Sequence, residues 1–555
     1  MKTKITPLER LYRLLVQDKR EVFYVLFFAV LNGAIGLALP LGFQAIINLV
    51  MGGRPSSAWW VLVAVVLAAI LFAGILQIFQ MQITEILQQR IFVRSAIEFS
   101  YRIPRLHPKG LIGDNPPELV NRFFDTLTVQ KAVPKVLLDA STSIFQIFFA
   151  LILLSIYHPL FVVAGAVVIV LVVIIFRTTW KRGLKTSLEE STHKYEVAYW
   201  LEQLANALNT FKLAGQSVWP DLRTKKFTEK WLGARKGHFK IIILQYAQLV
   251  GFRFILTGML LIFGGILVFE QQMSIGQFVA VEIVFILITN NADKLVKLAE
   301  PLFDTVTALE KIASVLERPL EGTDGRSISA KEKSWAVTID TEEGEHIDIQ
   351  PGERLAIVGY AGSGRAKFLN SVAGLLPERM AEVKVSGIQL DHLNLFNYRC
   401  AIGDNLRQEA LFKAPLRDNL TVGSNFSTED QLLEGLDKVG LYSWYEKLPL
   451  GLDQVISEDS EWISTSITQR LILLRALLRR SRILLLHDYL EHCERSLREK
   501  MLTAIFEQEG SILIASNRKD VIDKVDKAIV MKDGKVIYNG TPKSIPADIK
   551  NDLIF

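Results

Sequence analysis

Two kinds of hydrophobic pattern divide this chain. Up to about residue 297, long apolar stretches alternate with long charged segments, and a helix that spans a bilayer needs about 20 mainly apolar residues. Beyond about residue 334, short apolar runs alternate with helical patterns, which indicates a sheet covered by helices. The pattern predicts an all-α membrane domain over residues 1–318, a polar linker over 319–333 and an α/β domain over 334–555.

The membrane domain is predicted to contain six spans. The first two apolar stretches hold no charged residue, and the third and fourth are separated only by Tyr157, His158 and Pro159. The first stretch lacks a small-residue cleavage site, so it is interpreted as a span rather than a removable signal peptide. The approximate bounds of the spans are 23–50, 58–84, 136–157, 159–178, 248–270 and 275–297.

The basic residues orient these spans. Six Lys or Arg residues precede the first span, and the long segments after spans two and four are rich in both. The short connections on the other side contain only Arg54. Because loops rich in Lys and Arg stay in the cytosol, both termini and both long segments are expected to be cytosolic. Cys400 and Cys493 both fall in the C-terminal domain and are expected to be reduced thiols.

The composition and net charge indicate which kinds of binding partner to expect. Half of the 555 residues are hydrophobic, and the mean hydropathy of +0.27 is high for a soluble chain. The chain is therefore expected to reside in a membrane. The net charge of +5 is modest, and the basic residues between Lys212 and Lys240 are interpreted as a solvated helix face; no nucleic-acid partner is expected.

Two of the ionisable residues within the predicted spans, Glu282 and Arg253, deserve separate interpretation. Glu282 falls near the middle of the sixth span, and it is a candidate for the substrate path because a carboxylate is costly in hydrocarbon. Arg253 lies near the inner end of the fifth span, where its side chain is expected to extend toward the membrane interface.

The first candidate binding motif in the α/β domain is a glycine-rich loop. Residues 359–366 follow a strand-like run and fit the spacing G-x-x-x-x-G-K-[ST], whose backbone N–H groups wrap phosphates at a helix N-terminus. The lysine position holds an arginine, which keeps the charge on a bulkier planar group, and the Ser/Thr position holds an alanine, which offers no oxygen to Mg²⁺. The residues that the motif assigns to phosphate binding are Gly359, Gly362, Ser363, Gly364, Arg365 and Ala366.

Several further segments, which follow one another in the expected order along the chain, resemble parts of one protein family. Residues 101–106 and 117–125 look like the first intracellular loop of ABC exporter half-transporters, and residues 196–216 have the place of the second. Residues 469–477 closely resemble the helix that follows the signature sequence of the family. The chain therefore resembles an ABC exporter half-transporter of the bacterial inner membrane. Residues 39–44 in the first span are most similar to transporters of type I secretion.

The resemblance implies roles for positions that this chain fills with unusual residues. His487 stands where the family has the aspartate that holds Mg²⁺, and Asp488 stands where it has the glutamate that positions the attacking water. Asn517 replaces the switch histidine, and Gln408 lies near the place of a metal-contacting glutamine. In the signature stretch 463–467 both glycines are lost and Ser464 alone remains. These three positions, 487, 488 and 517, are expected to be non-functional in catalysis.

The expected function is half of a dimeric exporter with impaired or absent ATP hydrolysis. ATP is the cofactor implied by the resemblance, with weak or absent binding, and Mg²⁺ lacks its ligands. The partner stays open between a second copy, an intact ABC half-transporter and a periplasmic adaptor protein. Two alternatives also stay open: a non-hydrolysing homodimer that acts as a membrane scaffold or assembly component, and an exporter that still turns over ATP slowly.

Overall fold

A computed structural model describes most of the chain and divides it into two compact units. The first unit comprises Met1–Pro104 and Asp114–Arg318, and the second comprises Arg105–Gly113 and Pro319–Phe555. The described residues are 6–52, 57–112, 116–322, 325–328, 332–341, 344–376, 381–406, 410–422, 427–457, 460, 462–487 and 494–554.

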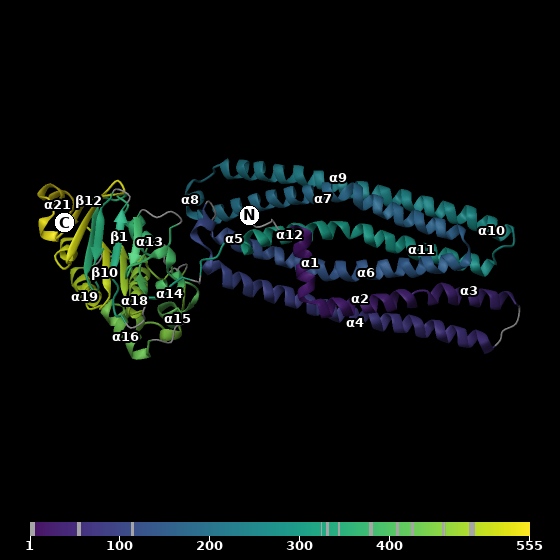
Figure 1. Ribbon diagram of the computed structural model, residues 1–555, viewed down its shortest axis with the longest axis horizontal. Helices are drawn as coiled ribbons and strands as arrows, with labels where there is room; N and C mark the ends of the chain where they lie inside the picture. Colours follow the sequence, from purple (N-terminus) through teal and green to yellow (C-terminus); the bar gives the residue numbers. More distant parts are fainter. Residues whose placement is uncertain are drawn as a thin grey trace. The chain divides into compact units, whose positions relative to one another are not determined.

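The first unit is a bundle of long helices (Figure 1). Among the described residues, six segments are long and apolar enough to cross a membrane: Lys19–Met51, Ser57–Arg105, Glu118–Tyr157, Leu160–Asn206, Trp219–Phe269 and Ile275–Leu316. The predicted six-span helical fold is confirmed. The α-helices of this unit are α1 (Pro7–Gln17), α2 (Lys19–Ile35), α3 (Ala38–Met51), α4 (Ser57–Arg102), α5 (Pro116–Asn121), α6 (Asp125–Tyr157), α7 (Leu160–Asn206), α8 (Leu208–Leu213), α9 (Trp219–Met259), α10 (Gly265–Phe269), α11 (Ile275–Lys297) and α12 (Ala299–Leu316).

The first apolar stretch is formed by two helices in succession. α2 ends at Ile35 and α3 begins at Ala38, and Pro40 stands in the first turn of α3, where its missing N–H costs no helical hydrogen bond. α2 packs on α4 and α6, whereas α3 packs on α4 and α11. At the crossing with α6, a Cβ added to Gly33 would lie 3.0 Å from the backbone of Phe145, so the glycine permits a close helix approach.

The second unit is an α/β domain (Figure 1). Its strands are β1 (Val337–Thr341), β2 (His346–Ile349), β3 (Arg354–Gly359), β4 (Ala381–Val385), β5 (Ile388–Gln389), β6 (Ile402–Asp404), β7 (Ala414–Pro415), β8 (Val455–Ile456), β9 (Ile483–His487), β10 (Ser511–Ala515), β11 (Lys527–Lys532) and β12 (Lys535–Gly540). Its α-helices are α13 (Arg365–Val372), α14 (Leu395–Cys400), α15 (Leu416–Thr421), α16 (Glu429–Lys438), α17 (Tyr442–Tyr445), α18 (Thr465–Leu478), α19 (Arg495–Phe506), α20 (Lys519–Ile522) and α21 (Ala547–Leu553).

Its largest sheet fixes the position of the candidate site. The strand order is β12-β11-β3-β10-β9-β6, in which only β12 runs antiparallel to its neighbour. The central strands β3, β9 and β10 are almost fully buried, as expected for parallel strands covered on both faces. Because these three strands are adjacent and parallel, the loops that follow them meet at one edge, where α/β proteins bind ligands.

Candidate nucleotide site

The loop after β3 adopts a conformation that its glycines permit. Gly362 and Gly364 have φ angles of +86° and +99°, in the left-handed region that side chains rarely adopt. At Gly359 an added Cβ would lie 2.5 Å from the carbonyl oxygen of Met531 and from Ser363 Oγ. α13 then begins at Arg365, so the strand, loop and helix follow the order that the sequence motif requires.

The loop is held by neighbours on two other segments. The carbonyl oxygen of Ser363 accepts a hydrogen bond of 3.0 Å from the backbone N–H of Gly534, in the turn between β11 and β12. The hydroxyl of Tyr360 donates to the carboxylate of Asp552 on α21. The Ser363 side chain is buried, and its Oγ has no hydrogen-bond partner. The loop thus retains a buried hydroxyl that is free to bind an incoming oxygen.

Asn517 ties the end of β10 to the start of the loop. Its Oδ1 accepts hydrogen bonds from the backbone N–H of Gly359 (3.0 Å) and from Nη1 of Arg365 (3.2 Å). Its Nδ2 donates to the carbonyl oxygen of Gly359 (3.0 Å). The Arg365 side chain is buried, so this contact lies inside the domain. Asn517, singled out in a different segment of the sequence, is thus brought together with Gly359 and Arg365 of the loop motif.

His487 is the last residue of β9 and is buried. Its backbone N–H donates to Oδ1 of Asn405 (2.8 Å), whose own N–H donates to the carbonyl oxygen of Leu485 (3.2 Å). The sequence analysis missed Asn405. Its signal is a polar residue directly after the buried strand β6, which pairs with β9 in parallel. Asp488 and Gln408 lie outside the described residues.

The two remaining candidates of the nucleotide site have roles in helix structure. Ser464 is exposed and caps α18, because its Oγ accepts a hydrogen bond of 3.3 Å from the backbone N–H of Ile467. Ala366 lies in the first turn of α13, and its carbonyl oxygen accepts a hydrogen bond of 2.9 Å from Nδ2 of Asn370.

A cluster of charges follows Asn517. Burial alone would raise the pKa of Asp520, but hydrogen bonds from Arg518 and Arg498 outweigh burial, and the pKa lies below its ordinary value. The carboxylate therefore stays ionised and neutralises two arginines close to the loop edge. Within the described ranges, no three His, Cys, Asp or Glu side chains gather as a metal site.

Glu282 and Arg253, the two ionisable residues singled out within the spans, have different surroundings. Glu282 lies on an exposed part of the surface of α11. Arg253 pairs with Asp293 through an Nη2–Oδ2 distance of 3.1 Å, and Lys297 approaches the same carboxylate at 2.8 Å. The expectation that Arg253 extends toward the interface stays a prediction, and the structure adds a carboxylate on the neighbouring helix as a partner for its charge.

This fold and loop define a class of membrane transporter: a helical bundle of six spans fused to a nucleotide-binding domain. Comparison with known families agrees, since residues 22–291 match the ABC transporter transmembrane region and residues 343–489 match the ABC transporter domain. The chain belongs to the ABC transporters and has the layout of an exporter half-transporter, a multi-pass membrane protein.

Individual relatives are distant in sequence. The lactococcin transport/processing ATP-binding protein LcnC-like of Lactococcus lactis subsp. lactis (strain IL1403) is 22% identical over 480 residues, which cover 83% of this chain and 66% of the relative. The ATP-dependent lipid A-core flippase of Neisseria meningitidis serogroup A is 26% identical over 288 residues, which cover 49% of this chain and 46% of the relative. The chain thus spans about two thirds or less of the length of these two relatives.

Among solved structures, a bacterial Atm1-family ABC exporter with ATP bound has the same fold. It matches with a TM-score of 0.81 at 16% identity and covers 95% of each chain. At this level of identity the likeness concerns the fold.

Proposed function

We propose that this chain is one half of a dimeric ABC exporter of the bacterial inner membrane, with cytosolic termini, whose own nucleotide site does not hydrolyse ATP. It works beside an ABC half with intact motifs, and that partner supplies ATP hydrolysis. The membrane fold and the family relationship support the exporter part of this proposal. The residues at the loop edge support the loss of hydrolysis.

The observation that carries the proposal is the contact of Asn517 with Gly359 and Arg365. In the family this position senses the terminal phosphate. Here both polar atoms of the side-chain amide are bonded to the backbone of Gly359, at 3.0 Å each. The side chain would have to break these bonds to reach a phosphate, so it serves as a brace of the loop rather than as a sensor.

The chemistry at two further positions supports the same proposal. Phosphoryl transfer depends on Mg²⁺ to stabilise charge and on a positioned water, and Mg²⁺ prefers oxygen ligands. Ala366 has a methyl group where the metal-binding hydroxyl is needed, and His487 has an imidazole where a carboxylate is needed. These residues do not fit Mg²⁺. The glycine loop and the unpartnered Ser363 hydroxyl still fit phosphate oxygens, so weak binding of ATP without the metal is proposed.

An exposed apolar tip supports dimerisation. α8 and its flanks, at the end of the hairpin of α7 and α9, carry large apolar side chains in the open, and Leu213 is 88% exposed. Such a patch in the cytosol marks a protein contact. In the family this loop presses into an ATP-binding domain. The side chains of the patch are Leu208, Leu213, Val218, Trp219 and Leu222.

Phosphate release and calorimetry on the purified chain in nanodiscs test the nucleotide part. No release of phosphate from MgATP above a protein-free control is expected, because the metal ligand and the phosphate sensor are lost. ATP is expected to bind with the same weak affinity in Mg²⁺ and in EDTA. Mg²⁺-dependent hydrolysis that Asp488→Asn abolishes would contradict the proposal, as would an affinity that rises when Mg²⁺ is added.

Native mass spectrometry of the complex extracted from its own membrane tests the partner. A mass that fits this chain plus one intact ABC half is expected. A mass that fits two copies of this chain would contradict the heterodimer and would favour the scaffold alternative.

A further inference from the structure

A hollow of about 280 Å³ lies in the α/β domain, apart from the nucleotide loop. Its main lining comes from three segments that are far apart in the sequence: residues 326–328 of the linker, residues 393–400 at α14, and Arg482. Arg482 stands directly before β9, whereas the nucleotide loop follows the end of β3, and both strands are parallel members of one sheet. The hollow and the nucleotide loop therefore lie at opposite edges of that sheet.

Hydrogen bonds join the linker to the body of the domain at this hollow. The backbone N–H of Arg326 donates to the carbonyl oxygen of His392 (2.8 Å), and the backbone N–H of Asn394 donates to the carbonyl oxygen of Arg326 (3.0 Å). The side chains also meet, because Nδ2 of Asn397 donates to Oγ of Ser327 (3.0 Å). These bonds fix the wall that the linker contributes to the hollow.

The charged side chains that line the hollow are both arginines. Arg326 is exposed, and its guanidinium makes no hydrogen bond or ion pair with the part of the chain that the structure describes. Arg482 lies over the ring of Trp335, with Cζ 5.2 Å from the ring centroid, and its Nε donates to the carbonyl oxygen of Glu332 (2.7 Å). Among the described residues that line the hollow there is no Asp or Glu. Two positive charges without a carboxylate between them attract an anion.

Trp335 adds a hydrogen-bond donor to these charges. It lines the hollow and is only 3% exposed, and its Nε1 has no hydrogen-bond partner. Its ring already contacts Tyr398, with centroids 6.1 Å apart and an interplanar angle of 16°, as well as Arg482. The group of the indole that is still unused is therefore the N–H. A buried donor without a partner costs free energy, which an oxygen atom of a bound anion would recover.

The lining fits a phosphate monoester. A guanidinium presents a planar fork of N–H groups that matches the oxygens of a phosphate. A phosphate monoester carries a charge of about −1.5 to −2 at neutral pH and three acceptor oxygens, which suits two arginines and an indole N–H. The apolar side chains of Ile328 and Leu393 remain for the organic part of the ligand. The volume lies just below the range of about 300–1,000 Å³ for drug-sized ligands, so the organic part must be small.

We propose that this hollow binds a small phosphate monoester and that the ligand fastens linker residues 326–328 to the body of the domain. Arg326 belongs to the linker, whereas Arg482 belongs to the sheet region, so one phosphate group held by both arginines bridges the two. The site is separate from the nucleotide loop. It is therefore independent of the proposed loss of ATP hydrolysis.

Alkylation of Cys400, a free and exposed thiol that lines the hollow, tests the binding. The full chain with Cys493→Ser, in a phosphate-free sugar detergent, is treated with N-ethylmaleimide, and mass spectrometry measures the labelling rate. Glycerol 3-phosphate is expected to slow the labelling at lower concentrations than inorganic phosphate does, because its carbon atoms contact the apolar wall. Potassium chloride at the same ionic strength should have no effect. Equal slowing by the chloride, or none by either phosphate, would overturn the site, and equal potency of the two phosphates would overturn the monoester.

Substitutions in the lining test the assigned contacts. Arg326→Gln removes a side chain without a partner in the described fold, so the variant is expected to fold and to need about tenfold more glycerol 3-phosphate, the effect of one charge-assisted hydrogen bond. Trp335→Phe keeps a ring beside Tyr398 but lacks the N–H, and it is expected to weaken the protection by a smaller factor. Arg495→Gln is the control, since it removes an exposed arginine that pairs with Glu499 on α19. Unchanged protection in Arg326→Gln would overturn the assignment.

Hydrogen exchange measured by mass spectrometry tests the fastening of the linker. With saturating glycerol 3-phosphate, peptides that contain the backbone N–H groups of Arg326 and Asn394 are expected to exchange more slowly, because these groups form the bonds between the linker and α14. Peptides of β11 should be unaffected. Unchanged exchange at both positions, under conditions that protect Cys400, would overturn the bridging role of the ligand.

Discussion

The two units place the same apolar residue types in opposite surroundings. In the α/β unit, Leu355 and Leu513 on neighbouring strands are fully buried, whereas in the helical unit Leu71 is 67% and Phe254 80% exposed. A sheet in water must bury its apolar side chains under helices, but a bundle in lipid gains little from turning them inward. Apolar content alone therefore does not locate a core. The solvent around each unit decides which apolar residues carry its stability.

One substitution made in both units tests this difference. Leu513→Ala in β10 should lower the free energy of unfolding by about 2–5 kcal/mol, because it opens a cavity in a packed core. Leu71→Ala in α4 should change it by less than about 0.5 kcal/mol, the usual size for an exposed position. Urea unfolding of the chain in detergent measures both values. Similar losses of unfolding free energy in the two variants would contradict the proposed difference between the two units.

A smaller effect is expected at the brace of the nucleotide loop. Asn517→Ala leaves the N–H and carbonyl groups of Gly359 without their partner, which should cost about 1–3 kcal/mol in the free energy of unfolding. Asn539→Ala is the matched control, since Asn539 is exposed and donates one hydrogen bond, to the carbonyl oxygen of His346. Its cost should stay within about 0.5 kcal/mol. Equal urea midpoints for the two variants would show that Asn517 is not a brace.

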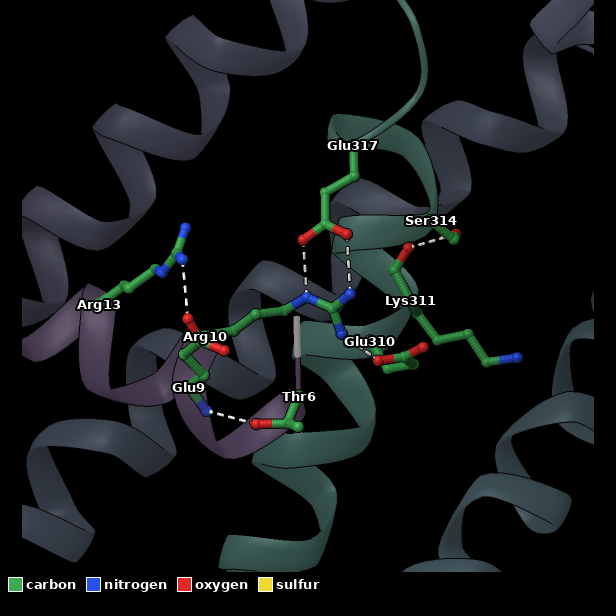
Figure 2. A network of polar contacts seen from close by, with 8 residues as sticks. All are labelled: Thr6, Glu9, Arg10, Arg13, Glu310, Lys311, Ser314 and Glu317. Carbon is green, nitrogen blue, oxygen red and sulfur yellow. Dashed lines mark hydrogen bonds and ion pairs between the residues drawn. The ribbon is translucent and has the colours of Figure 1, made fainter. Parts of the chain in front are cut away.

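The smallest effect concerns pH in the helical unit. Figure 2 shows that Arg10 of α1 donates two hydrogen bonds to Glu317 at the end of α12, and these bonds hold the pKa of Glu317 below its ordinary value of 4.5. Because this pKa is lowered in the folded state, the pair stabilises the contact of α1 with α12 above pH 4.5 and loses this effect as the pH falls through the folded pKa. The distance between spin labels at Tyr12→Cys and Ser314→Cys, placed in a Cys400→Ser and Cys493→Ser background, should broaden only in that acidic range. The Arg10→Gln chain should show no such step, and a step near neutral pH in either chain would contradict the assignment to Glu317.

The sequence predicted the elements better than the contacts between them. The apolar runs at 355–358, 483–486, 512–515 and 528–531 all lie in strands of one sheet, because a parallel strand buried on both faces leaves a continuous apolar signature. The glycines of the loop were likewise readable, since two of them require positive φ angles. For Asn517, the sequence indicated only that it replaces the histidine expected at this position of the family motif. Its bonds to Gly359 join residues 158 apart, and no local pattern encodes such a distant pairing.

The same reason explains what was missed in the helical unit. Arg10 and Glu317 are 307 residues apart, so the sequence offers two ordinary surface charges rather than a pair. The pairing of Arg253 with Asp293 was missed because it depends on how α9 and α11 face each other. Hydropathy showed that the first stretch is apolar, but not that it consists of α2 and α3, since both segments are equally suited to lipid.

Because the first span is divided into α2 and α3, its two parts pack against different helices. Its first part, α2, is held by α6 at the close approach of Gly33, and its second part, α3, is held by α11, where an added Cβ on Gly276 would lie 2.3 Å from Oδ1 of Asn48. A displacement of α11 would therefore reach α3 before α2. Because the span is divided at Gly36 and Leu37, its two parts follow different neighbours and do not pack as one uniform rod.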